Sequence, residues 1–82
     1  MLEFDRNAAG AVVRRIRVER GLSQEVLSGL AGMARSHLAM VEAGRKQPNF
    51  ESIWRLANAL GMEPSQLVKR IEEETECRAK EK

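Results

Sequence analysis

Apolar positions recur at three- and four-residue steps along most of this chain, which is the pattern of amphipathic helices. The first such stretch runs from about Arg6 to Arg20, and Asp5 stands where it can cap the start of a helix. Its expected inner face consists of Ala9, Val13, Ile16 and the stem of Arg20. No alternating run of β-branched residues indicates a strand. The pattern therefore predicts an all-α fold.

Two short helices joined by a tight turn are expected next, over residues 24–31 and 35–42. Ser23 precedes the first of them, at the position where serine caps a helix. Gly32 is expected to end that helix, since glycine readily adopts the left-handed conformation of a sharp turn. Gly44 is expected to end the second helix.

A fourth helix is expected after Asn49, which can serve as its cap, and should end at Gly61. A fifth begins near Pro64, because proline fits the first turn of a helix. This helix carries an apolar row of Leu67, Val68 and Ile71 and is then expected to fray. The sequence thus predicts one domain over residues 1–71, followed by a charged tail over residues 72–82.

Charge is unevenly divided between these two parts. The net charge of the 82 residues is +2. Residues 1–71 hold eleven bases and seven acids, whereas residues 72–82 hold five acids and three bases. The globular part is therefore the basic part, as a DNA-binding protein requires.

Other features of the chain limit its class. No apolar run approaches the roughly 18–20 residues that span a bilayer, and the N-terminus has no apolar core of a signal peptide. The lone Cys77 cannot form an intrachain disulfide. We therefore expect a cytoplasmic protein without a membrane partner.

The segment from Leu22 to Gly44 resembles the helix-turn-helix of the phage repressor and Cro-like family. The similarity continues upstream through VRRIRVERGLSQ (residues 13–24) and downstream through RKQPN (residues 45–49), and covers roughly residues 9–68. The resemblance implies a five-helix repressor-like domain. Its third helix, residues 35–42, would enter the major groove of double-stranded DNA.

The resemblance also implies two structural or backbone-binding roles. Arg17 and Glu42 would form a partly buried ion pair that orients the reading helix; the alternative is two unrelated solvated charges. Gln24 would contact a DNA phosphate at the start of its helix, where free N–H groups attract an anion. The alternative there is an exposed glutamine without a role.

The candidates for reading bases lie on the outer face of the third helix. They are Arg35, Ser36, Ala39 and Met40. Arginine can bond guanine O6 and N7 together, and a small side chain or a methionine can rest on a thymine methyl. Two alternatives stay open: Arg35 could bind a phosphate, and Met40 could pack into the protein.

Backbone contacts are expected from the end of that helix onward. Arg45 and Lys46 would clamp the DNA backbone beside Asn49, and His37 would face it from the edge of the helix. A neutral, uninvolved His37 is equally compatible with the sequence. Without a cluster of cysteine and histidine residues, we expect no metal and no cofactor.

One position departs from the family pattern. Ala34 stands where Ser, Thr, Asp or Asn usually caps the third helix. Losing a cap costs about 1 kcal/mol. Ser36 could instead cap a shortened helix, which would move the reading face.

These features predict a sequence-specific transcriptional regulator, compact like repressors and the controller proteins of restriction–modification systems. A homodimer on a two-fold operator is expected because one recognition helix reads too few base pairs. The expected dimer contact is Trp54, Val68 and Ile71, with Leu67 pointing inward. Alternatively, Ile71 folds back on the first helix.

Two other function classes fit the sequence less well. A protein-interaction module or antitoxin could keep the fold without using the basic surface. The sequence contains no paired carboxylates beside a base, no activated nucleophile and no glycine-rich phosphate loop, so an enzyme is not expected. No small-molecule ligand is indicated.

Overall fold

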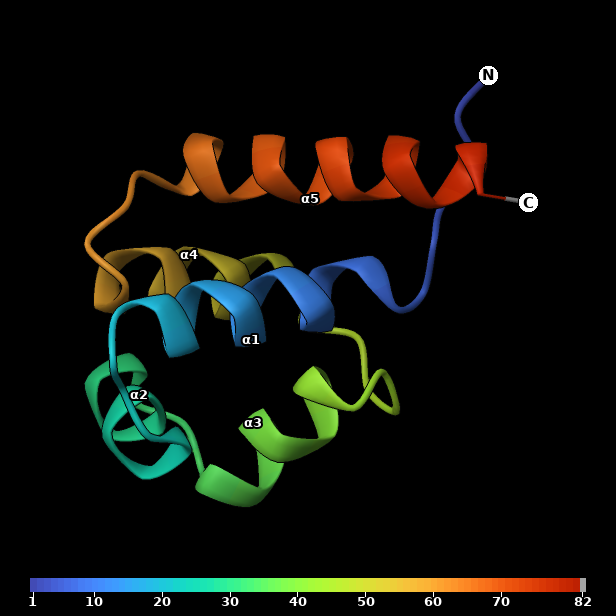
Figure 1. Ribbon diagram of the computed structural model, residues 1–82. Helices are drawn as coiled ribbons and strands as arrows, with labels where there is room; N and C mark the ends of the chain where they lie inside the picture. Colours follow the sequence, from blue (N-terminus) through green and yellow to red (C-terminus); the bar gives the residue numbers. More distant parts are fainter. Residues whose placement is uncertain (82) are drawn as a thin grey trace.

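Five α-helices follow one another in residues 1–81, the part of the chain that this computed structural model describes (Figure 1). Their bounds are Ala8–Glu19 (α1), Gln24–Ala31 (α2), Arg35–Glu42 (α3), Phe50–Ala59 (α4) and Pro64–Lys80 (α5). No strand occurs within residues 1–81, and the predicted all-α fold is confirmed. α5 lies along one side of the molecule against α1 and α4, and α3 lies at the opposite edge beside α2 (Figure 1).

One core of aliphatic side chains joins all five helices. Its largest fully buried members are Val12, Val13, Ile16, Leu27, Leu38, Val41, Leu56, Leu60 and Leu67. Leu67 points inward as predicted. None of the helices in the described residues combines the length and the apolar character that crossing a membrane requires.

The residues predicted to begin α2 and α4 and to end α2 do so in the structure. The Oγ of Ser23 accepts a hydrogen bond from the Val26 N–H at 3.0 Å, and the Oδ1 of Asn49 accepts one from the Ser52 N–H at 2.8 Å. Each bond satisfies a backbone donor that the helix itself leaves free. Gly32 ends α2 with φ +69°, a conformation that glycine adopts without strain.

The expected start of α1 is wrong by two residues. The helix begins at Ala8 with Asn7 as its N-cap, and Asn7 makes no side-chain capping bond. Asp5 caps no helix; its Oδ1 accepts a hydrogen bond from the Asn7 N–H at 2.8 Å. The segment before α1 is therefore a turn. Arg20 also departs from its expected place on the inner face of α1, because its Nε donates to the Leu60 carbonyl at 2.6 Å.

The expected fraying after Ile71 is wrong as well, since α5 continues to Lys80. Glu74 accepts hydrogen bonds from Arg15 at 2.8 Å and from Arg78, one turn further on, at 2.7 Å. These bonds hold the pKa of the Glu74 carboxyl below its ordinary value. Thr75 is buried beside them. The acidic run is thus anchored to α1; only Lys82 of the predicted tail lies outside the described residues.

Ile71 does not stand exposed on the monomer. It is half-buried and packs against the core, whereas Val68 is 44% exposed. Ile71 therefore packs inward, as in the alternative to an exposed contact residue. Among the predicted contact residues on α5, Val68 alone is exposed.

Candidate nucleic-acid interface

A tight turn holds α3 against α2. The Met33 N–H donates to the Ser28 carbonyl at 2.9 Å, and the Gly32 N–H donates to the Gly29 carbonyl at 3.2 Å. α3 then begins at Arg35, with Ala34 as an N-cap that makes no side-chain bond. Ser36 therefore does not cap a shortened helix, and both Arg35 and Ser36 lie in the first turn of α3.

The outer face of α3 is free of protein contacts that would bury it. Arg35, Ser36 and Met40 are exposed, and Ala39 is half-buried. A side chain every third or fourth residue shares one face of a helix, so Ala43, which is exposed, continues the stripe of Ser36 and Met40. Ala43 was missed in the sequence, although its spacing marks it as a member of this face.

The inner face of α3 is held rigidly. Leu38 and Val41 are buried in the core. At the end of the helix, Glu42 accepts hydrogen bonds from Arg17, Nε to Oε2 at 2.7 Å and Nη2 to Oε1 at 3.0 Å. The side chains of Arg17 and Glu42 are 12% and 3% exposed. The structure thus brings the two predicted partners together as a bidentate pair between α1 and α3, and the bond to Glu42 raises the pKa of Arg17.

Gln24 belongs to the same network. Its Nε2 donates to the Glu42 Oε1 at 3.0 Å, and Arg17 also donates to the Leu22 carbonyl at 2.8 Å. Side chains of three helices therefore meet at one carboxylate, and Arg17 also ties in the turn between α1 and α2. Gln24 is half-buried there, and the amide oxygen of its side chain is left for another partner.

A loop of residues 43–49, which we call the clamp loop, follows α3. The backbone N–H groups of Arg45 and Lys46 both donate to the Met40 carbonyl, at 3.0 and 3.3 Å. Both side chains are exposed and form no ion pair in the described residues. Asn49 at the end of the loop uses its side-chain oxygen to cap α4. His37 is half-buried at the edge of α3.

Some basic side chains on other helices are already engaged with acids. Arg15 pairs with Glu74, and Arg55 pairs with Glu51 at 2.8 Å on α4. The free cations of the clamp loop therefore form a basic patch beside the exposed face of α3. Within residues 1–81, no group of three or more His, Cys, Asp or Glu side chains could hold a metal ion.

Two short helices joined by a glycine turn, with the second of them uncovered on its outer face, define a helix-turn-helix protein. The helix-turn-helix family model matches residues 13–67. This chain belongs to that family, which is one of DNA-binding regulators.

The most informative relatives are regulators. The chain is 35% identical over 63 residues to the uncharacterized HTH-type transcriptional regulator y4dJ of Sinorhizobium fredii, a match that covers 77% of this chain and 82% of the relative. It is 37% identical over 59 residues to the immunity repressor protein of Bacillus phage phi105. That match covers 72% of this chain and 41% of the phage protein.

A solved structure agrees with both matches. The restriction–modification controller protein C.AhdI from Aeromonas hydrophila is 40% identical and superposes with a TM-score of 0.73. The similarity covers 77% of this chain and 96% of C.AhdI. The fold and the arrangement of the helices are therefore those of a compact regulator.

Proposed function

We propose that this protein regulates transcription by binding double-stranded DNA in a sequence-specific way, with α3 in the major groove. The observation that carries the proposal is the asymmetry of α3. Its inner face is fixed by Leu38, Val41 and the Glu42 network, while its outer face exposes Arg35 and Ser36 at the N-terminal turn. The N-terminal residues of a recognition helix contact the base edges. The regulator and repressor names of the relatives agree with this function.

The proposed interface divides into reading and clamping groups. Arg35, Ser36, Ala39 and Met40 would face the bases, and Arg45, Lys46, His37, Asn49 and Gln24 would face the phosphates. The division follows from position, since the first group occupies the outer face of α3 and most of the second lies at its margins. Gln24 would contribute through its backbone N–H or through the second Nε2 hydrogen, which its bond to Glu42 leaves free.

Arg35→Ala is expected to reduce discrimination at one base position by about 1–3 kcal/mol, because a bidentate arginine–guanine contact is lost. Arg45→Ala is expected to weaken binding to all sequences about equally and to flatten the salt dependence, because only a phosphate contact is lost. Sites selected from a random DNA pool, followed by titrations at two salt concentrations, measure both effects.

If Arg35→Ala and Arg45→Ala changed base discrimination and salt dependence in the same way, the division into base-reading and phosphate-binding groups would be wrong. Absence of DNA binding by the wild-type protein even at low salt would contradict the function itself. That second result would favour the alternative in which the fold serves as a protein-interaction module or antitoxin.

We infer that the protein binds a two-fold operator as a homodimer through a surface that keeps Trp54 and Val68 from the expected contact and adds Phe50. Trp54 is 50% exposed, Phe50 is 70% exposed, and their rings stack edge to face at 6.1 Å. Val68 lies on α5, which packs against α4. Half-buried Ile71 offers less surface to a partner. Exposed aromatic and aliphatic side chains on adjoining helices are typical of an interface.

Val68→Glu is expected to shift the protein toward monomer and to lower operator affinity, while the domain stays folded because Val68 is outside the core. Val18→Glu is the matched control, since Val18 is an exposed valine on α1. Sedimentation of the three proteins tests the proposal. A wild-type monomer at micromolar concentration, or equal dimerisation of all three, would place the interface elsewhere.

A further inference from the structure

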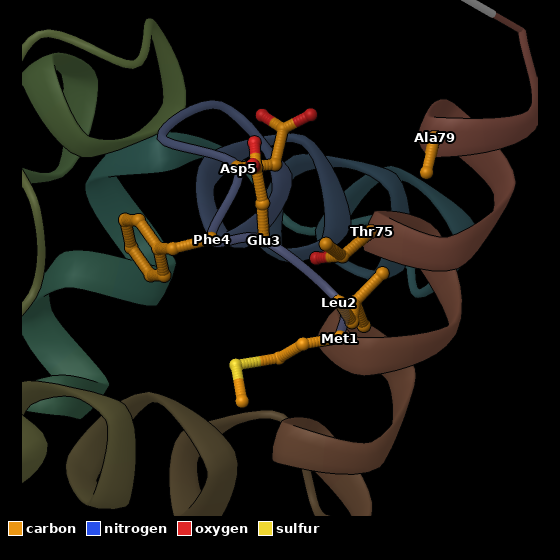
Figure 2. A pocket seen from close by; sticks show the side chains of 7 residues that line it. All are labelled: Met1, Leu2, Glu3, Phe4, Asp5, Thr75 and Ala79. Atoms are coloured by element: carbon orange, nitrogen blue, oxygen red, sulfur yellow. The ribbon is translucent and has the colours of Figure 1, made fainter.

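The seven residues before α1 connect two distant parts of the molecule. The chain starts beside the C-terminal half of α5, where Met1, Leu2, Glu3, Phe4 and Asp5 line an open hollow of about 240 Å³ with Thr75 and Ala79 (Figure 2). Phe4 is 73% exposed, so this hollow is not a closed pocket. The segment then runs down to the clamp loop, where α1 begins (Figure 1).

Two contacts join this segment to the clamp loop. The side-chain Nε2 of Gln47 donates a short hydrogen bond to the Arg6 carbonyl. Asn7 lies directly against Gly44, so closely that a methyl group built on Gly44 would collide with the Asn7 side chain. Residues 6 and 7 are therefore neighbours of residues 44 and 47, although about forty positions separate them in the sequence.

Cations predominate where residues 6 and 7 meet the clamp loop, although Asp5 and Glu81, together with Arg78, line one hollow with Arg6. Arg6 is exposed and forms no ion pair within residues 1–81, like Arg45 and Lys46 in the adjoining loop. The clamp loop itself contains no acidic residue. Asp5 is the nearest acid along the chain, and its Oδ1 accepts the Asn7 N–H. Three cations that form no ion pair within residues 1–81 thus lie on two segments that contact each other, next to the end of the proposed recognition helix.

We propose that Arg6 binds a DNA phosphate next to those bound by Arg45 and Lys46, and that Gln47 is the positioning residue that holds Arg6 there. This inference rests on the proposed function. A guanidinium suits the contact because its donors match two phosphate oxygens at once. Because the bond from Gln47 already orders the Arg6 backbone in the free protein, less conformational entropy is lost on DNA binding than for an unattached N-terminal segment.

The salt dependence of DNA binding separates this role from a structural one. Each phosphate contact contributes about 0.9 to the slope of log K against log salt. Arg6→Ala should therefore lower the slope by about 0.9, so that the affinity lost between 50 and 200 mM salt is about three- to fourfold smaller. Arg6→Lys should restore most of the slope. Lys69→Ala on α5 removes the same charge from an exposed site and should leave the slope unchanged.

A double-mutant cycle tests Gln47. Gln47→Ala should weaken DNA binding about threefold in the wild-type background, as expected for one ordered side chain released, and should have no further effect when Arg6 is already alanine. Additive effects would overturn the positioning role. An unchanged slope for Arg6→Ala on DNA that the wild type binds would overturn the phosphate contact. Failure of the wild type to bind DNA at low salt would instead refute the proposed function.

Discussion

Gly10→Ala is expected to lower the free energy of unfolding by about 3 kcal/mol, the upper end of the range for overpacking a core. Gly10 is buried where α1 crosses α3, and a methyl group on it would collide with the carbonyl oxygen of Val41. The obstacle is backbone on both sides, so no side chain can turn away to make room. Thermal unfolding should show a loss of about 12–24 °C in Tm for a domain of this size.

Gly29→Ala is the matched control, because Gly29 is also a helical glycine but is exposed, and nothing outside its own helix backbone and chain neighbours lies within 4 Å of an added methyl group. It should gain about 0.5–1 kcal/mol from the better helix propensity of alanine. Opposite signs for the two variants would show that close helix packing is what requires glycine at position 10. A stable Gly10→Ala protein would mean that α3 can move away from α1 at little cost.

Arg17→Met is expected to destabilise the fold by about 3 kcal/mol, because it leaves the nearly buried Glu42 carboxylate without its charged partner. Glu42 would keep the bond from Gln24 but lose both bonds from the guanidinium, and the Leu22 carbonyl would lose its donor as well. Chemical denaturation of the two proteins measures the difference in the free energy of unfolding.

Arg14→Met provides the comparison, since Arg14 is exposed on the same helix and forms no ion pair in the described residues. Its effect should stay within about 0.5 kcal/mol. The double variant Arg17→Met, Glu42→Leu should be more stable than Arg17→Met alone, because no lone charge is then buried. Equal small losses for the Arg17 and Arg14 variants would show that the pair contributes no stability.

Helix number and order could be predicted from the sequence because their signals are local. Ser23, Gly32 and Asn49 each form a hydrogen bond with a backbone group two to four residues away. The bounds of α2 and the start of α4 can therefore be predicted from neighbouring residues in the sequence. Periodic apolar positions likewise predict that Leu67 faces the core. The start of α1 was misplaced because Asp5 bonds to Asn7 in a turn instead of capping a helix, and the end of α5 was misplaced because a distant contact with Arg15 decides it.

In the candidate site, too, some features follow from local sequence signals and others from contacts between distant residues. Helical spacing alone places Arg35, Ser36 and Met40 on one face of α3, and the structure leaves that face exposed. The ion pair of Arg17 and Glu42 was expected only through the resemblance to a family, since no local pattern links positions 25 residues apart.

The sequence by itself thus determined the five helices, the turn between α2 and α3, and the outward face of α3, all of which depend on interactions within a few residues. Only the tertiary structure decided how far α5 extends, because Arg15 on α1 holds Glu74 in place. It also turned Ile71 toward the core, and it brought Arg6 to the clamp loop. Each of these depends on atoms that are close only after the chain has folded.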